Sequence, residues 1–441
     1  MFEKFFLHFI LIYFQIQEIL NSLVFSFEKI CNSENFSMNL IYNNIYSNIS
    51  LGSPLQTIPF YLSFNSNLFI IKDKIIGGFF NEETSKSLSK NNEREFILHF
   101  EGTTYYGYYE TENFLFKNNK NKKIKVNNLI FSLSNNYNSS NSIKTNELIN
   151  NYSIIGLKLS NYRGNNDKES FIMQLKDKKI LDTYSFSFEY ESKEKGLLYL
   201  GCCINQFDNN YQLSNYRYTK VEYDRNNFEW KINFDKVNYS ENNSEPIFRD
   251  GIFNINIGGM IGNFKYKEFI YENVFNKYLK ENICFEEIIY DEYLIIYCNK
   301  NFNIKEFPNI VFYHKNMNIS FVFDYNDLFT ENNDKIYFNV FFNIKFSSFY
   351  WIFGEIFFRK YQIVFDQDKQ LIGFWINKKN VKKFNYHKYL YISFICIIIF
   401  LIVVIYNIKN KIPRKIKANE LEENIIYNSI NDGNNKHLFK N

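Results

Sequence analysis

The most constraining feature of this sequence is a long series of short apolar runs separated by clusters of Asn, Asp, Gly and Ser. The series extends from about residue 40 to residue 377, and apolar and polar residues alternate in most runs. A period of two is typical of half-buried β-strands, and the polar clusters are typical of turns. We therefore predict a mainly β protein, with helices only at 168–181 and 266–281, where apolar residues recur at helical spacing.

Length and composition exclude several classes of protein. The chain has 441 residues, of which 46% are hydrophobic and 22% charged, and its formal net charge is +4. Such a chain can bury a core and is not a nucleic-acid-coating protein, and its length favours two or more domains. The five histidines are scattered and the cysteines lack the paired spacing of a zinc site. We therefore expect no metal, no other cofactor and no nucleic-acid partner.

Two apolar stretches frame the chain. Residues 5–14 follow Lys4 and are too short to cross a bilayer, which favours a signal peptide over 1–22. Residues 390–406 are uncharged and long enough for one transmembrane helix, and a basic segment opens the expected cytoplasmic tail, 407–441. We expect a type I single-pass membrane protein of the secretory pathway or the cell surface, with a lumenal or extracellular ectodomain. A buried core helix is the alternative interpretation of 390–406.

The cysteines and the glycosylation motifs agree with a lumenal ectodomain. Cys284 and Cys298 flank two strand-like runs with acidic turn residues between them, which predicts a disulfide that closes a hairpin in an oxidising compartment. N-glycosylation motifs predict a glycoprotein, although an Asn-rich chain contains some of them by chance. They begin at Asn35, Asn48, Asn138, Asn151, Asn238, Asn242 and Asn318.

The two halves of the chain have a similar order of expected elements. Each half has early strands, a polar loop after an apolar strand, a helix, and closing strands. This order predicts two similar β lobes, at 40–204 and 218–377, which are joined by a connection at 205–217.

Motifs in both halves resemble the pepsin-like (A1 family) aspartic peptidases. Residues 51–70, LGSPLQTIPFYLSFNSNLFI, keep Gly52, Pro54 and Gln56 of the turn and strand that lead to the first catalytic loop of that family. Residues 351–376, WIFGEIFFRKYQIVFDQDKQLIGFWI, are similar to its closing hairpin. The resemblance covers about residues 40–377 and is closest to membrane-anchored and, by composition, plasmepsin-like members.

The resemblance implies a bilobal pepsin-like acid-protease fold with a cleft between the lobes. Residues 96–114 resemble the flap hairpin that closes over substrate, and Trp230 matches a tryptophan before the second catalytic loop. Cys284 and Cys298 fit the family's disulfide in the second lobe. We expect Trp230 to be a core residue, because a buried tryptophan more often packs than binds substrate.

Active members of this family use two aspartates from facing lobes, which share a proton and activate a water. Counting from Gly52 places Ser63 at the first aspartate position, and counting back from Asn67 places Leu62 there. Asn254 takes the second position. In both alignments of the first loop the position carries a neutral side chain, which cannot act as general base and general acid.

Two further positions complete the comparison. Phe100 matches the flap tyrosine, so the hydroxyl of that tyrosine is lost. Asp250 lies four residues before Asn254 and is the candidate substitute for the second aspartate, but Arg249 precedes it where a buried apolar residue is expected.

We therefore expect a pseudoenzyme that binds an extended peptide or a protein partner in its cleft without cutting it. The alternative is an active aspartic endopeptidase of the secretory pathway with unusual catalytic residues. A third hypothesis is an adhesion or structural protein whose cleft is filled by the aromatic residues of 341–353. Glu355, where the family usually has Asp, is expected to be a surface or turn carboxylate.

Overall fold

The computed structural model describes residues 22–375 with short gaps. The gaps are 33, 91–93, 101–102, 119–121, 140–150, 160–169, 202–214, 223–227, 240–243, 246–248 and 347–348. The chain divides into two units, Met1–Lys378 and Lys379–Asn441, and all described residues belong to the first.

Several expected segments lie outside the described residues. They are nearly all of the signal peptide at 1–22, most of the connection at 205–217, the transmembrane helix at 390–406 and the tail at 407–441. No helix within the described part of the chain has the length and apolar composition of a membrane span.

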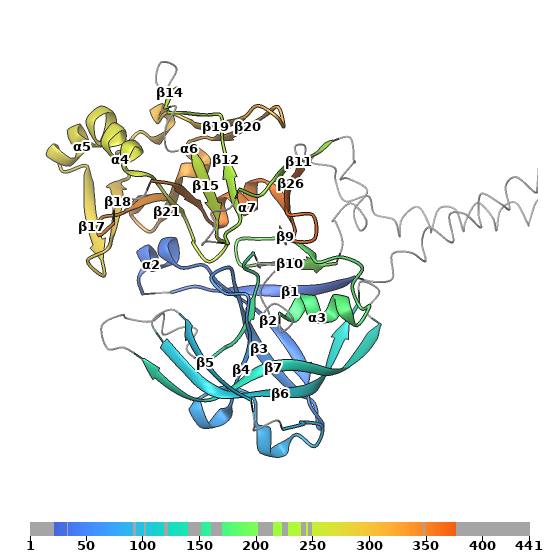
Figure 1. The fold of residues 1–441 in the computed structure, drawn as a ribbon. Coiled ribbons are helices and arrows are strands. Elements are labelled where there is room, and N and C mark those ends of the chain that lie inside the picture. Colours follow the sequence, from blue (N-terminus) through green and yellow to red (C-terminus); the bar gives the residue numbers. More distant parts are fainter. Residues whose placement is uncertain are drawn as a thin grey trace, which may run out of the picture. The chain divides into compact units, whose positions relative to one another are not determined.

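The described chain is mainly β, as the alternating pattern predicted. One sheet has 13 strands in the order β11-β26-β25-β9-β10-β1-β2-β3-β8-β4-β7-β6-β5, and Figure 1 shows its two longest strands, β6 and β7, side by side. The strands are β1 (Leu23–Ile30), β2 (Asn44–Leu51), β3 (Gln56–Ser63), β4 (Phe69–Lys72), β5 (Glu95–Phe100), β6 (Thr103–Lys117), β7 (Lys123–Ser139), β8 (Ser153–Gly156), β9 (Ser185–Tyr190), β10 (Lys195–Leu200), β11 (Tyr216–Lys220), β25 (Gln362–Asp366) and β26 (Leu371–Trp375).

Two further sheets are built from the second half of the chain. A nine-stranded sheet has the order β12-β15-β24-β16-β23-β18-β22-β21, with β17 paired to β18, and a four-stranded sheet has the order β14-β13-β19-β20. The strands are β12 (Lys231–Asn233), β13 (Lys236–Asn238), β14 (Ser244–Glu245), β15 (Asp250–Phe253), β16 (Met260–Ile261), β17 (Cys284–Ile289), β18 (Tyr293–Asn299), β19 (Ile310–His314), β20 (Ile319–Phe323), β21 (Phe329–Asn332), β22 (Lys335–Phe338), β23 (Val340–Asn343) and β24 (Trp351–Phe353).

The helices are short. The α-helices are α2 (Phe36–Ile41), α3 (Phe171–Asp177), α4 (Phe264–Ile270), α5 (Asn276–Lys280), α6 (Tyr325–Leu328) and α7 (Glu355–Lys360). The described residues also include the 3₁₀ turns η2 (Lys74–Ile76), η3 (Glu82–Thr84) and η9 (Ile304–Glu306) and a π-helical turn, η8 (Tyr271–Phe275). The helix predicted at 266–281 is confirmed as the continuous run α4–η8–α5. The helix predicted at 168–181 is confirmed only in its centre, α3, because Lys179 takes a positive φ of 58° that ends the helical turn.

The first strand lies before the point where we placed the start of the β pattern. β1 pairs with β10 on one side and with β2 on the other, and Leu23 and Phe27 are buried. At the other end of the chain, β25 pairs with β9 and β26 with β11. Strands from the first and last described residues therefore share one sheet, which ties the two halves together.

Both halves repeat one arrangement of four strands. In the first half, β3 runs parallel to β8, β4 pairs antiparallel with β8, and β4 runs parallel to β7. In the second half, β15 runs parallel to β24, β16 pairs antiparallel with β24, and β16 runs parallel to β23. Each repeat carries a loop after its first strand, so the topology gives these two loops equivalent surroundings.

Cys284 and Cys298 form a disulfide, as the sequence predicted. They face each other in the register of β17 and β18, and both are buried. The bond closes the hairpin where β17 begins and β18 ends.

Replacing both cysteines with serine should lower the free energy of unfolding by about 2–3 kcal/mol. The disulfide joins residues 14 positions apart, and without it the unfolded chain gains conformational entropy. The midpoint of urea unfolding measures the change. Cys31→Ser is the matched control, since Cys31 is an exposed free thiol. Equal midpoints for the double variant and the control would contradict the prediction.

Candidate functional site

Ser63 and Asn254 end the first strand of their repeats. Ser63 is the last residue of β3 and lies opposite Gly156 of β8. Asn254 follows β15 directly, and its backbone N–H donates to the carbonyl of Phe353 in β24 at 3.0 Å. Both residues therefore stand where a strand gives way to a loop.

Two glycines fix how the repeats correspond. A Cβ on Gly156 would lie 2.4 Å from the carbonyl oxygen of Ser66, and a Cβ on Gly354 would lie 2.2 Å from that of Ile257. Both contacts are too close for any side chain, so only glycine lets the loop cross its strand here. Ser66 lies three residues after Ser63 and Ile257 lies three residues after Asn254, so Ser63, and not Leu62, is the position equivalent to Asn254 in the repeat.

Each side chain receives the same local hydrogen bond. The N–H of Asn65 donates to Ser63 Oγ at 3.1 Å, and the N–H of Asn256 donates to Asn254 Oδ1 at 3.0 Å. Asn254 Nδ2 then donates to Asn65 Oδ1 at 2.9 Å, across the two repeats. An amide–amide hydrogen bond therefore joins the two loops at the centre of the site.

Asn256 forms a second link between the loops. Its Nδ2 donates to the carbonyl of Leu62 at 2.7 Å, and its Oδ1 accepts from the N–H of Phe64 at 2.7 Å. Asn43 supports the same loop from below β2, because its N–H donates to the carbonyl of Asn256 and its Nδ2 to that of Ile255. Asn256 is 4% exposed, so these bonds are shielded from water.

Asn256→Ala should lower the free energy of unfolding by about 3 kcal/mol, because it leaves one buried backbone N–H and one buried carbonyl without partners. Urea unfolding measures the loss. Asn273→Ala removes an exposed asparagine that bonds only within its helix, and should change stability little. If Asn256→Ala lowered the free energy of unfolding no more than this control, the hydrogen bonds of Asn256 would not contribute to stability.

The chemistry of these groups is limited to hydrogen bonding. Ser63 has no exposed surface, Asn254 is half-buried and Asn65 is exposed. Amides and a hydroxyl can donate and accept hydrogen bonds, but they do not ionise at neutral or mildly acidic pH. The site can hold a polar group, and it lacks a proton-sharing pair at the two strand ends.

A family model described as eukaryotic aspartyl protease matches residues 45–375 of the chain. The chain belongs to the eukaryotic aspartyl protease family. The match spans both repeats and both loops, so the fold is that of a pepsin-like aspartyl protease domain. Comparison with curated proteins gave no match.

The candidate substitute carboxylate of this aspartyl protease domain is engaged elsewhere. Asp250 opens β15, and its Oδ2 lies 3.0 Å from Lys231 Nζ. Its Oδ1 accepts a hydrogen bond from Asn233 Nδ2 at 2.8 Å. The structure therefore places Asp250 at the start of the strand, against β12, while Asn254 follows the end of the strand.

The flap position of the protease domain is apolar and covered. Phe100 ends β5 and is 7% exposed. It belongs to a buried cluster with Tyr61 of β3, Phe96 of β5 and Ile154 of β8. An aromatic ring without a hydroxyl thus packs against the wall formed by β3 and β8.

Two further expectations for the domain concern tryptophan and the aromatic stretch 341–353. Trp230 is a core residue, as predicted: it is 1% exposed, and its Nε1 donates to the carbonyl of Leu157 at 2.9 Å. In the stretch 341–353 the two ends are buried in β23 and β24, but Phe346 and Phe349 are 65% and 52% exposed. These exposed rings do not fill a closed groove.

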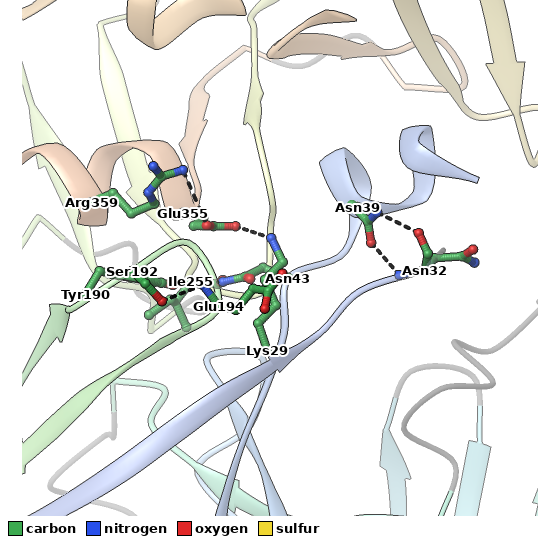
Figure 2. A network of polar contacts seen from close by, with 10 residues as sticks. All are labelled: Lys29, Asn32, Asn39, Asn43, Tyr190, Ser192, Glu194, Ile255, Glu355 and Arg359. Atoms are coloured by element: carbon green, nitrogen blue, oxygen red, sulfur yellow. Dashed lines mark hydrogen bonds and ion pairs between the residues drawn. The ribbon is translucent and has the colours of Figure 1, made fainter. Parts of the chain in front are cut away.

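The prediction that Glu355 is a surface or turn carboxylate is wrong. Glu355 is 4% exposed and accepts a hydrogen bond from Lys29 Nζ, and its other oxygen lies 3.8 Å from an Arg359 guanidinium nitrogen. Figure 2 shows Glu355 between these two cations. The backbone N–H of Glu355 donates to the carbonyl of Ile257, which holds the start of α7 against the second loop.

The surroundings of this ion pair are also polar and buried. Burial raises the pKa of Tyr190 well above its ordinary value, and the nearby Glu355 carboxylate raises it further. The hydroxyl therefore stays protonated and accepts a hydrogen bond from Asn43 Nδ2 at 3.0 Å. Within the part of the chain that the structure describes, no three His, Cys, Asp or Glu side chains gather as a metal site would require.

Sequence reasoning missed the role of two asparagines. Asn65 and Asn256 are not among the predicted site residues, yet they supply the hydrogen bonds that join the repeats. The available signal was their equal spacing, since each lies two residues after a strand-end position. That spacing places a polar group at the same point of two loops that a twofold repeat brings together.

Proposed function

We propose that this chain is a catalytically inactive pepsin-like protein that binds an extended peptide or a protein segment between its two repeats. The observation that carries the proposal is the hydrogen bond from Asn254 to Asn65. It fills the centre of the site with neutral amides, where catalysis by this family requires two carboxylates that share a proton.

The loss of acids does not remove the means of binding. Extended peptides are held mainly by backbone hydrogen bonds and by pockets for alternate side chains. Asn65 is exposed and Asn254 half-buried, so both amides can meet a peptide backbone. β5 lies at one edge of the 13-stranded sheet, where its outer backbone groups are able to pair with an added strand.

The expected location supports a partner met outside the cytoplasm. The proposal includes a type I orientation in the secretory pathway or at the cell surface, and an ectodomain that meets its peptide or protein partner there. The apolar stretches at 5–14 and 390–406 support this orientation.

The test measures cleavage and binding with the same peptides. Purified full-length chain is incubated with an unbiased peptide library at about pH 4, where one acid of a proton-sharing pair stays protonated. We expect no cleavage above the level with pepstatin present, and saturable binding of a subset of peptides. Pepstatin-sensitive cleavage would overturn the proposal and support an active peptidase with unusual residues.

Binding at the centre of the site is tested by substitution. The double variant Asn65→Ala and Asn254→Ala should lower the affinity for the selected peptides about tenfold, because one or two hydrogen bonds to the peptide are lost. Asn273→Ala is the matched control on an exposed helix. Unchanged affinity in the double variant would place the peptide elsewhere.

A further inference from the structure

A cavity lies beside the Lys29–Glu355 ion pair. Its volume is about 660 Å³, which is within the usual range for small-molecule sites. The end of β1, the helix α2, the turn at Lys193 and Glu194, the strand β21 and the start of α7 form its walls. These elements come from distant parts of the chain, so the cavity is a product of the tertiary fold.

Buried polar groups form part of the cavity wall. The side chains of Lys29 and Glu355 are 9% and 5% exposed. Asn339 is 4% exposed, and its Nδ2 donates to the carbonyl of Asp327 at 2.7 Å. Its Oδ1 is buried and has no hydrogen-bond partner. A buried acceptor without a donor costs free energy, so this wall of the cavity contains an unsatisfied polar group.

The charges of the cavity favour a ligand with both signs. Lys29 and Arg359 flank the single carboxylate of Glu355, so this corner carries one excess positive charge. The Arg359 side chain is 40% exposed and one of its guanidinium nitrogens lies 3.8 Å from Glu355, so the guanidinium has donors left for a second carboxylate. Over the whole lining, acidic and basic side chains are present in equal numbers, and Glu331 lines the wall formed by β21.

We propose that this cavity binds a small zwitterion, either a short peptide with both termini free or a free amino acid. The ligand carboxylate lies at Arg359, and its ammonium lies at the exposed Glu331 carboxylate. The exposed thiol of Cys31 also lines the cavity, so a bound ligand shields it.

The cavity also touches the second loop of the central site. Gly258 is part of its lining, and a Cβ at this glycine would lie 1.8 Å from the carbonyl of Asn39 in α2. The carbonyl of Asn339 accepts from the N–H of Met260, and that of Leu40 from Gly259. An occupant therefore contacts the elements that hold the Asn254 loop in place.

The test uses tri-alanine, alanine and a blocked tri-alanine with acetyl and amide ends. Each is titrated into the full-length chain by calorimetry, and alkylation of Cys31 is followed by peptide mapping. We expect tri-alanine or alanine to bind and to slow alkylation of Cys31, and the blocked peptide to bind at least about tenfold more weakly, because it lacks both charges. Which of the two unblocked probes binds more tightly decides between the peptide and the amino acid.

Variants separate this cavity from the proposed peptide site. Arg359→Gln should lower the affinity for the unblocked probe about tenfold. Arg359→Lys should retain part of this affinity, because it keeps the positive charge. Arg217→Gln, on the exposed strand β11, and the double alanine variant of Asn65 and Asn254 should leave binding unchanged. The proposal would be overturned if no probe bound, or if the blocked peptide bound as tightly as the unblocked probes. It would also be overturned if binding were unchanged by Arg359→Gln and did not slow the alkylation of Cys31.

Discussion

Replacing Ser63 and Asn254 with aspartate, together with Asn65→Gly, is expected to give this chain acid-dependent peptidase activity. The backbone N–H groups of residues 65 and 256 already donate to the side chains at these positions, and would donate equally to carboxylates. Asn65→Gly removes the amide that now occupies the space between the two loops. A paired general acid and base is worth about 10² to 10⁴ in rate, so cleavage should rise at least about 10²-fold over the unmodified chain.

The controls separate chemistry from shape. A variant with Ser63→Asn and Asn65→Gly has similar side-chain sizes but no carboxylate, and should stay inactive. Asn254→Asp alone should also stay inactive, because one carboxylate cannot share a proton with a second. Fluorogenic peptide cleavage with and without pepstatin measures all variants. If the triple variant folds, as judged by its unfolding midpoint, and remains silent, the two strand ends are not the chemical centre of this domain.

Lys29→Met is expected to lower the free energy of unfolding by about 3–5 kcal/mol. The substitution keeps most of the side-chain volume but leaves Glu355 as a buried carboxylate whose remaining cation, Arg359, lies 3.8 Å away. Breaking one partner of a buried ion pair is costly because the other charge stays desolvated. Urea unfolding monitored by tryptophan fluorescence measures the loss.

The double variant Lys29→Met and Glu355→Gln should recover much of this loss, because it removes the uncompensated charge. Lys195→Met is the matched control, since Lys195 pairs with Glu28 at the surface and screening makes such pairs weak. A destabilisation by Lys29→Met no greater than that by Lys195→Met would mean that Glu355 is reached by water and is not buried as the structure shows.

The fold could be predicted to a large extent from local pattern. Alternation of period two gave the strands, and the helical spacing at 266–281 gave α4, η8 and α5. The spacing and turn residues around Cys284 and Cys298 gave the hairpin and its disulfide. These features depend on residues that are close in sequence, so the local propensities already contain the information.

The candidate site could be predicted only in part. The sequence placed Ser63 and Asn254 near the ends of comparable strands, but it left Leu62 as an alternative to Ser63. The choice between them depends on Gly156 and Gly354, whose contacts with the loops arise only when β8 and β24 pair with the first strand of each repeat. Register across a parallel pair is a property of distant segments, and spacing along the chain does not encode it.

The ion pair of Glu355 likewise could not be predicted from the local sequence. Its local sequence, GEIFFRK, has the pattern of an exposed helix start, and an acid there is favourable without any partner. Burial came from β1, a strand that lies 326 residues earlier and supplies Lys29. The sequence by itself determined most of the strands, the helix at 266–281, the disulfide hairpin and the absence of acids at the two loop positions. Only the tertiary structure decided which side chains meet across the repeats, because hydrogen bonds and desolvation depend on distances between segments that are remote in the chain.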